Sequence, residues 1–156
     1  IYICDNISRF INKYKKLAKE YNRILVEEYI PGREIQVAVM GQKPLGAIEL
    51  VPKRKFYDYT AKYSSSAQTK HIMPASLVPK KYKEVLRLAK KAHQLLECRG
   101  ITRSDFRFFN NKFYLLETNT QPGMTKLSLV PEIARYSGIN FEDLVVWMIK
   151  DASYNR

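Results

Sequence analysis

A chain of 156 residues, 46% of them hydrophobic, can form one folded domain or a piece of a larger one. Its two cysteines are too few for a disulfide scaffold, and it has neither a leader-like segment nor a long uncharged apolar run, so we expect a soluble, reduced, cytoplasmic protein without a membrane segment. The net charge of +12 would attract polyanions, but no zinc-finger spacing, RNP pattern or helix-turn-helix pattern accompanies it, and nucleic acid is therefore the less favoured partner.

The N-terminal part predicts a helix followed by an antiparallel meander. Apolar residues recur every three or four positions over residues 7–21, which is the pattern of a helix. The period then changes to that of strands, which we expect at residues 24–30, 34–40 and 45–51. Residues 52–75 show no sustained period, and a loop of this length inside a domain indicates a lid or a binding loop.

Helices and strands alternate in the second half. Pro79 suits the first turn of a helix that runs to about Leu96, and two short helices are expected at residues 129–136 and 141–149, the last with Asn140 as N-cap. Between them lie two strands, residues 101–109 and 113–119. The order predicts an α+β fold, an antiparallel sheet flanked by helices.

The two later strands predict a polar constellation. Asn tolerates the left-handed conformation of a tight loop, so we expect a three-residue connection at residues 110–112. Counting back from it gives three cross-strand pairs, Phe109 with Phe113, Asp105 with Glu117, and Arg103 with Asn119. Strand alternation adds Arg107 and Leu115 to the same face.

Two opposed carboxylates repel one another unless positive charge lies between them. A hard divalent cation such as Mg²⁺ would supply that charge, because it prefers oxygen ligands. The pair alone is weak evidence, since a glutamate at a strand end is usually only solvated.

Five motifs together resemble one enzyme family, the D-alanine–D-alanine ligases of the ATP-grasp superfamily. The resemblance covers nearly the whole chain from about Ile24 and matches the C-terminal part of the family, that is, part of the central domain and the C-terminal region. The motifs are VEEYIPGRE (26–34), FYDYTAKY (56–63), CRGITRSDFR (98–107), LLETNTQPGMT (115–125) and SLVPEIA (128–134).

The resemblance implies roles for individual residues around the polar constellation. Asp105, Glu117 and Asn119 match the ligands of two Mg²⁺ ions, with Glu117 bridging them, and Mn²⁺ could replace Mg²⁺. Arg103 and the Gly123 N–H match the groups that stabilise the oxyanion of the tetrahedral intermediate.

Other matched positions concern the substrates. Ser128 matches the serine that binds the carboxylate of the second D-alanine, although it could instead be a helix N-cap. Lys62 and Tyr63 match the lysine and tyrosine of a mobile loop, where the lysine approaches the γ-phosphate of ATP. The positions that match the nucleotide site are Glu27, Glu28, Tyr29, Ile30, Glu34, Phe56, Lys62 and Leu116.

The implied activity is the ATP-dependent joining of two D-alanines through an acyl phosphate, for peptidoglycan precursor synthesis. The chain starts at Ile1 and lacks the family's glycine-rich phosphate loop, so we expect a C-terminal fragment without the N-terminal substrate domain. Such a fragment should be inactive alone. The complete enzyme could be a homodimer. Two alternatives stay open, another ATP-grasp carboxylate–amine ligase and a non-catalytic basic module that binds nucleic acid.

Overall fold

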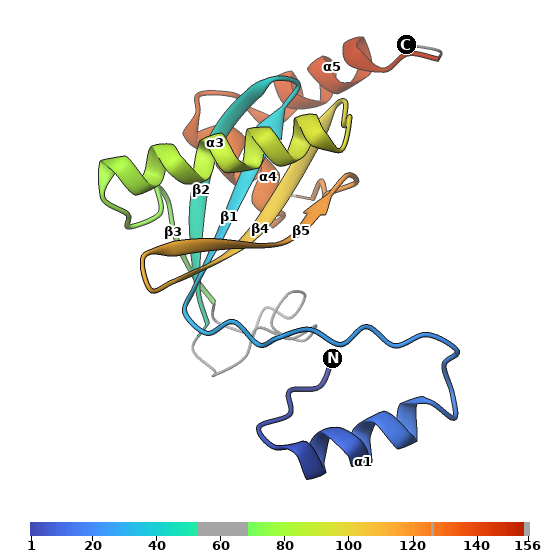
Figure 1. Ribbon diagram of the computed structural model, residues 1–156. Coiled ribbons are helices and arrows are strands. Elements are labelled where there is room, and N and C mark those ends of the chain that lie inside the picture. The colour runs from blue at the N-terminus through green and yellow to red at the C-terminus, as the bar shows by residue number, and fades with distance from the viewer. Residues whose placement is uncertain (53–68, 126, 155–156) are drawn as a thin grey trace. The chain divides into compact units, whose positions relative to one another are not determined.

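The computed structural model describes residues 1–52, 69–125 and 127–154, and the chain forms two compact units, Ile1–Ile30 and Pro31–Arg156 (Figure 1). None of the helices within the described ranges has both the length and the apolar character needed to cross a membrane.

The first unit contains one helix, α1 (Ile7–Leu17). The Asn6 side chain caps it by accepting a hydrogen bond from the Arg9 N–H. The helix is shorter than predicted, because the chain continues beyond Leu17 as hydrogen-bonded turns.

The strand predicted at residues 24–30 is wrong. This segment is not part of any strand in the structure, and most of its side chains are exposed, including Leu25 and Val26. Apolar and β-branched residues favour a strand only when a neighbouring strand satisfies the backbone and a core covers the side chains.

The second unit is built on a five-stranded antiparallel sheet with the order β3-β2-β1-β4-β5. Four strands confirm the prediction, but the short β3 lies inside the predicted lid, because three residues are too few to show a period. Its pairing with β2 corrects that part of the expected loop; residues 53–68 lie outside the described residues. The strands are β1 (Arg33–Met40), β2 (Lys43–Val51), β3 (Lys70–Ile72), β4 (Ile101–Phe109) and β5 (Lys112–Asn119).

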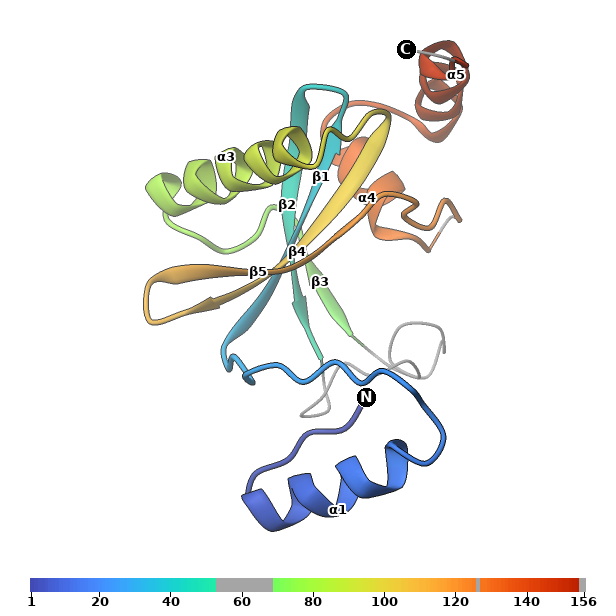
Figure 2. The ribbon, with the colours of Figure 1, turned by 45° about the vertical axis from the view of Figure 1, so that its right-hand side comes forward.

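Helices cover both faces of the sheet. Figure 2 shows α3 (Pro79–Leu95) on one side, and α4 (Leu129–Tyr136) on the other. The last helix, α5 (Phe141–Asp151), begins with the predicted N-cap, since Asn140 Oδ1 accepts a hydrogen bond from the Asp143 N–H at 2.7 Å. The three predicted helices are thus confirmed, α3 and α5 with small differences at their ends.

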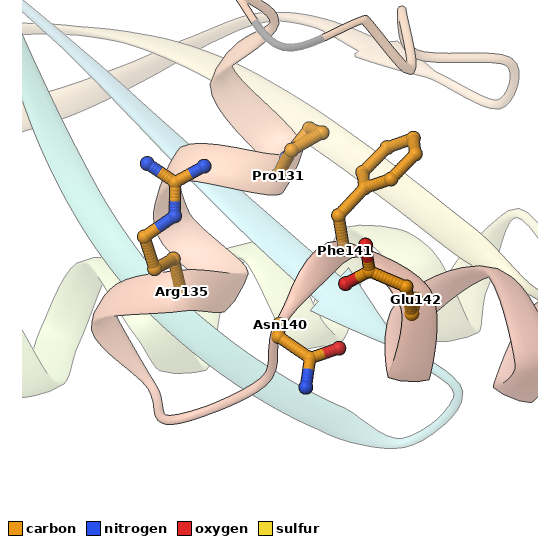
Figure 3. Close-up of a pocket in the computed structure, with 5 residues that line it drawn as sticks. All are labelled: Pro131, Arg135, Asn140, Phe141 and Glu142. Atoms are coloured by element: carbon orange, nitrogen blue, oxygen red, sulfur yellow. The ribbon is translucent and has the colours of Figure 1, made fainter.

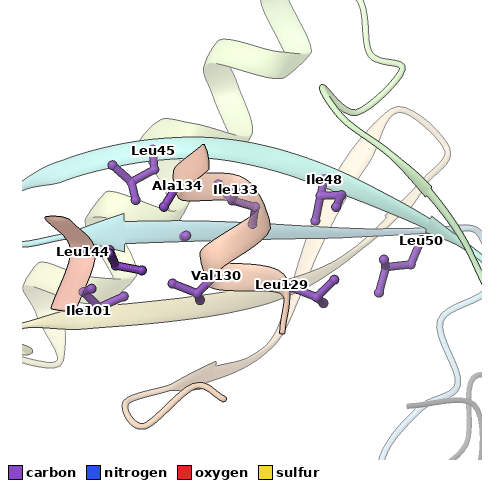
Figure 4. Close-up of a cluster of buried hydrophobic side chains, with 10 residues drawn as sticks. Leu45, Ile48, Leu50, Ile101, Leu129, Val130, Ile133, Ala134 and Leu144 are labelled. Carbon is purple, nitrogen blue, oxygen red and sulfur yellow. The ribbon is translucent and has the colours of Figure 1, made fainter. Parts of the chain in front are cut away.

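Each face has its own apolar cluster. On the α3 side, Val85 and Ala89 of the helix pack with Val37 and Phe106 of the sheet. On the α4 side, Ile133 and Leu144 belong to a cluster with Ile48 and Leu50 of β2 (Figure 4).

The α4-side face changes character across the sheet. The register aligns one residue from each of four neighbouring strands into a row that begins apolar on β2 and becomes polar towards β5. That row is Ile48, Gln36, Asp105 and Glu117. The polar half of this face holds the predicted constellation.

Candidate functional site

The turn of the β4–β5 hairpin is tighter than predicted. Phe109 pairs with Lys112, so the connection has two residues, Asn110 and Asn111, and the expected pair of Phe109 with Phe113 is wrong. Both asparagines have positive φ, 46° and 61°. Two consecutive residues of this kind make the two-residue hairpin turn that matches the twist of the strands, and asparagine tolerates it.

A bulge then restores the predicted register. Between Asp105 and Phe106 the pairing shifts, so that Phe106 pairs with Leu115 while Asp105 pairs with Glu117, and Leu116 is the additional residue on β5. Asp105 opposite Glu117 and Arg103 opposite Asn119 are therefore confirmed.

The bulge also moves Leu115 away from the predicted face. Because Leu115 pairs with Phe106, it shares the face that carries α3 rather than the face of Glu117, and the expectation for Leu115 is wrong. Tyr114, which pairs with Arg107, takes its place on the polar side.

Arg103 supplies the positive charge between the two carboxylates. Its Nε donates to Asp105 Oδ1 at 2.8 Å and its Nη2 to Asp105 Oδ2 at 3.0 Å, a two-pronged ion pair. The same Nη2 lies 3.8 Å from Glu117 Oε1. The positive charge that the two opposed carboxylates require is thus supplied, in this structure, by the Arg103 guanidinium.

A second polar group from β1 adjoins this pair. Gln36 lies opposite Asp105 on the neighbouring strand and donates from Nε2 to Glu34 Oε1 at 3.1 Å. Arg107 approaches the other oxygen of Glu34, with Nη2 3.6 Å from Oε2. The predicted nucleotide contact Glu34 is therefore buried and held between an amide and a guanidinium.

Gln36 was not predicted as part of the site. It is fully buried, and its Oε1 has no hydrogen-bond partner in the part of the chain that the structure describes. The strand alternation that places Glu34 on this face also places Gln36 there, so the pattern contained the signal.

The strand β1 is braced from the opposite face by Arg33. Its guanidinium binds both oxygens of the buried Glu49, at 2.7 and 2.6 Å, and also donates to the Ser76 carbonyl. The hydrogen bond to Glu49 raises the pKa of Arg33 above its ordinary value. This pair fixes the start of β1, directly before Glu34.

The loop after β5 brings Gly123 and Ser128 together. A Cβ at Gly123 would lie only 2.9 Å from Ser128 Oγ, so the backbone approaches this hydroxyl closely. Ser128 Oγ accepts a hydrogen bond from the Thr125 N–H at 2.9 Å and lies 2.9 Å from Thr125 Oγ1. Ser128 precedes α4 but its side chain makes no capping bond, so its hydroxyl does not serve as the N-cap alternative proposed.

The remaining predicted residues are not all brought to this group. Asn119, at the end of β5, accepts a hydrogen bond from the Gln121 N–H on Oδ1 at 2.9 Å. Leu116 is half exposed at the bulge. The predicted residues Glu27, Glu28, Tyr29 and Ile30 belong to the first unit. Phe56, Lys62 and Tyr63 lie outside the described residues.

A separate pocket of about 340 Å³ lies between α4 and α5 (Figure 3). Its lining residues are Pro131, Arg135, Asn140, Phe141 and Glu142. None of the predicted site residues is among them, so this pocket is not part of the candidate site.

The comparison with protein families gives one match that spans nearly the whole chain. A family described as "D-ala D-ala ligase C-terminus" matches residues 1–150.

Curated relatives agree with that match. A D-alanine–D-alanine ligase of Pelagibacter ubique (strain HTCC1062) is 61% identical over 156 residues, which are 100% of this chain and 51% of that protein. The ligase of Rhodopseudomonas palustris (strain BisA53) is 51% identical over 140 residues, 86% of this chain and 45% of that protein. The chain thus spans about half the length of the curated relatives it matches.

Solved structures of two ligases resemble the fold. The D-alanine–D-alanine ligase from Bacillus anthracis, complexed with ATP, aligns with a TM-score of 0.80 and 28% identity over 96% of this chain and 49% of its own. The ligase from Coxiella burnetii aligns with a TM-score of 0.79 and 25% identity over 96% of this chain and 40% of its own.

Proposed function

We propose that this chain, which belongs to the D-alanine–D-alanine ligase C-terminal family and has the α+β fold of the ATP-grasp ligases, is part of an enzyme that joins two D-alanines at the expense of ATP. The proposal depends most on one observation. Asp105 opposes Glu117 and Arg103 opposes Asn119 in the β4–β5 hairpin, so four polar residues share one face of the sheet.

The residues present fit a divalent cation. Asp105 and Glu117 already face one positive group in common, because Arg103 Nη2 lies 3.0 Å from the Asp105 carboxylate and 3.8 Å from that of Glu117. Asn119 Oδ1 keeps a second lone pair beside its bond to Gln121. No three His, Cys, Asp or Glu side chains of the described ranges form a cluster that could hold a metal. The donor set that we propose is instead two carboxylates and one carboxamide.

Such a set suits Mg²⁺ or Mn²⁺, which bind through one or two carboxylates and complete their shell with water and phosphate oxygens. We therefore propose Asp105, Glu117 and Asn119 as the ligands, with Glu117 shared between two ions. A cation held there would offset the negative charge of the ATP phosphates.

The reaction that we propose has two steps. The carboxylate of the first D-alanine attacks the γ-phosphorus of ATP, and ADP leaves, which gives an acyl phosphate. The amine of the second D-alanine attacks the acyl carbon, loses a proton, and phosphate leaves. Arg103 and the Gly123 N–H stabilise the oxyanion between these events.

Ser128 is proposed to hold the carboxylate of the second D-alanine. Its closeness to Gly123 supports this role, because the group that binds the acceptor and the group that stabilises the oxyanion must both lie near the acyl carbon. Lys62 and Tyr63 are proposed to act at the γ-phosphate; both lie outside the described residues.

The nucleotide contacts are proposals with unequal support. Leu116 offers a half-exposed apolar side chain at a bulge of an edge strand, a surface suited to a flat base. Glu34 is oriented by Gln36 and Arg107. The roles of Glu27, Glu28, Tyr29, Ile30 and Phe56 rest on the sequence motifs. ATP and D-alanine are the substrates we propose, in the cytoplasm, with a homodimer as the assembly.

The 156 residues alone are proposed not to turn over. Catalysis in this family would also need a glycine-rich loop and two lysines for the phosphates, and a domain for the first D-alanine. Removing even one preorganised charge contact from a reacting group can cost about a hundredfold in rate.

A chimera tests the function. These 156 residues would be joined to the remaining half of the Pelagibacter ubique ligase, and phosphate release measured with ATP and D-alanine. We expect activity that depends on D-alanine, and a loss of about a hundredfold or more in Glu117→Gln, which keeps the size but removes the shared charge. Glu142→Gln, an exposed carboxylate on α5, is the matched control and should leave the rate unchanged.

Three results would contradict the proposal. The Glu117→Gln chimera could retain full activity, which would remove the metal-bridge role. The isolated chain could release phosphate with ATP and D-alanine, which would show that these 156 residues suffice for turnover. A chimera that accepts another amine or hydroxy acid in preference to D-alanine would favour a different ATP-grasp ligase.

A further inference from the structure

Each oxygen of the Asp105 carboxylate accepts a hydrogen bond from a side chain of its own strand. Arg103 binds one oxygen through Nε and the other through Nη2, at 2.8 and 3.0 Å. Both side chains are largely buried, with 13% and 7% of their surfaces exposed. A two-pronged, shielded ion pair of this kind is among the stronger hydrogen-bonded contacts in proteins.

Glu117 is in a different situation. Its side chain is 58% exposed, and its nearest recorded approach to the guanidinium is 3.8 Å. The two carboxylates that face one another across the hairpin therefore differ in accessibility, one open to solvent and the other held by arginine.

We propose that Arg103 and a divalent cation compete for the Asp105 carboxylate. This inference rests on the metal site proposed above. A hard cation binds the same carboxylate oxygens that the guanidinium now occupies, and two positive groups at one carboxylate repel each other. Because of this repulsion, we expect cation binding at Asp105 to weaken or break the two hydrogen bonds from Arg103.

This competition gives Arg103 a role before catalysis. With no cation present, the guanidinium offsets the repulsion between Asp105 and Glu117 and keeps both in register. When Asp105 turns to a cation, the guanidinium is released from that carboxylate and becomes available to another anionic group. The loading of the metal site and the freeing of Arg103 for the oxyanion become one event.

Metal affinity measured without any turnover tests the inference. The probe is Mn²⁺ alone, titrated into the 156-residue chain, with free Mn²⁺ followed by its electron paramagnetic resonance signal. Arg103→Met removes the competitor, and we expect Mn²⁺ to bind about tenfold or more tightly than in the unaltered chain. Arg103→Lys keeps the charge but loses the two-pronged grip, and should bind more tightly than the unaltered chain and less tightly than Arg103→Met.

The lysine variant separates direct competition from general electrostatics. Arg99→Met removes the same charge from an exposed position just before β4 and should leave the affinity unchanged. Equal affinities for Arg103→Lys and the unaltered chain would overturn the inference, because charge alone would then account for any effect of methionine.

The outcomes also distinguish this inference from the proposed function. If Glu117→Gln abolishes binding while both Arg103 variants bind as the unaltered chain does, the metal site stands and the competition is wrong. If no variant binds Mn²⁺, both are wrong.

A second measurement needs no variant. In the unaltered chain, the Arg103 Nε–H resonance should be protected from exchange with water because of its bond to Asp105. Saturation with Mg²⁺, judged from the backbone amide of Glu117, should shift that resonance and remove the protection. An unchanged, protected Nε–H at saturation would overturn the inference.

Discussion

The two hairpins of the sheet are built in contrasting ways. In the β1–β2 hairpin each strand has six consecutive buried residues, because both lie in the interior of the sheet, with helices on both faces. In the β4–β5 hairpin, β5 is the edge strand and none of its residues is buried. Both strands of the first hairpin are thus held by the core, whereas β5 is held by its pairing with buried β4 and by Phe113, which packs against the α3-side cluster.

The contrast explains where chemistry can be placed. A strand that is buried on both faces has few positions for charged groups, because each would need a buried partner. The edge hairpin leaves Glu117 open to solvent, while β4 beside it is anchored by buried Phe106 and Ile101. The side chains of β5, Glu117 among them, are therefore positioned by pairing with a strand that is anchored in the core.

The largest expected effect comes from shortening one apolar side chain in each hairpin. Ile48→Ala on β2 removes a fully buried group from the α4-side cluster and should cost about 3 kcal/mol in the free energy of unfolding. Leu115→Ala on β5, where the side chain is 47% exposed, should cost less than about 1 kcal/mol. Urea unfolding of both variants measures the difference, and similar losses would show that β5 is as much part of the core as β2.

The same contrast governs what the sequence could predict. Periodicity located β1, β2 and the helices α3, α4 and α5, because a buried face leaves a repeated pattern. It failed for residues 24–30, where the apolar residues have no paired strand, and for β3, which is too short for a pattern. Local sequence does not determine which segment, distant in the chain, a strand will pair with.

The candidate site was predicted through two compensating errors. The sequence predicted a connection of three residues where the structure has two, which shifts the pairing at the turn by one residue. The bulge at Leu116, which was not predicted, shifts the pairing by one residue in the opposite sense, so Asp105 opposes Glu117 as expected. The grip of Arg103 on Asp105 could not be predicted, because side-chain direction depends on packing from elements distant in sequence.

The next largest effect on the free energy of unfolding concerns β4, which pairs with β1 of the first hairpin and with β5 of the second. His93 of α3 is fully buried and its Nδ1 lies 2.8 Å from Thr102 Oγ1 of β4. Burial lowers the pKa of His93 below its ordinary 6.5, although a hydrogen bond with the Cys98 backbone partly opposes this. The unfolded chain therefore takes up a proton near pH 6.5 that the folded chain does not, and stability falls as the pH drops through that value.

For a single proton this loss is at most about 1.4 kcal/mol per pH unit. We expect the unaltered chain to lose up to about 1 kcal/mol more than His93→Gln between about pH 7 and pH 5.5, measured by urea unfolding. The other histidine, His71, is present in both chains and cancels in the difference. If the free energy of unfolding varied with pH in the same way for both chains, His93 would accept a proton in the folded state. The packing of His93 against Thr102 of β4 would then be looser than its burial suggests.

The smallest effect is expected at Gln36, the polar residue of the core hairpin that lies opposite Asp105. Gln36→Leu removes the 3.1 Å hydrogen bond to Glu34, which costs stability, but it also removes a buried oxygen without a partner among the described residues, which restores some. These two contributions to the free energy of unfolding oppose one another, so we expect a net change within about 1 kcal/mol.

Thr102→Val is the matched control. Its hydroxyl has a buried partner in His93, so the substitution should lower the free energy of unfolding by about 2 kcal/mol. A loss for Gln36→Leu as large as that of Thr102→Val would mean that Gln36 stabilises the core hairpin as a fully bonded residue. A small loss accompanied by altered Mn²⁺ affinity would instead assign this residue of β1 to the polar site of β4 and β5, and the boundary between the two regions would then run through β1.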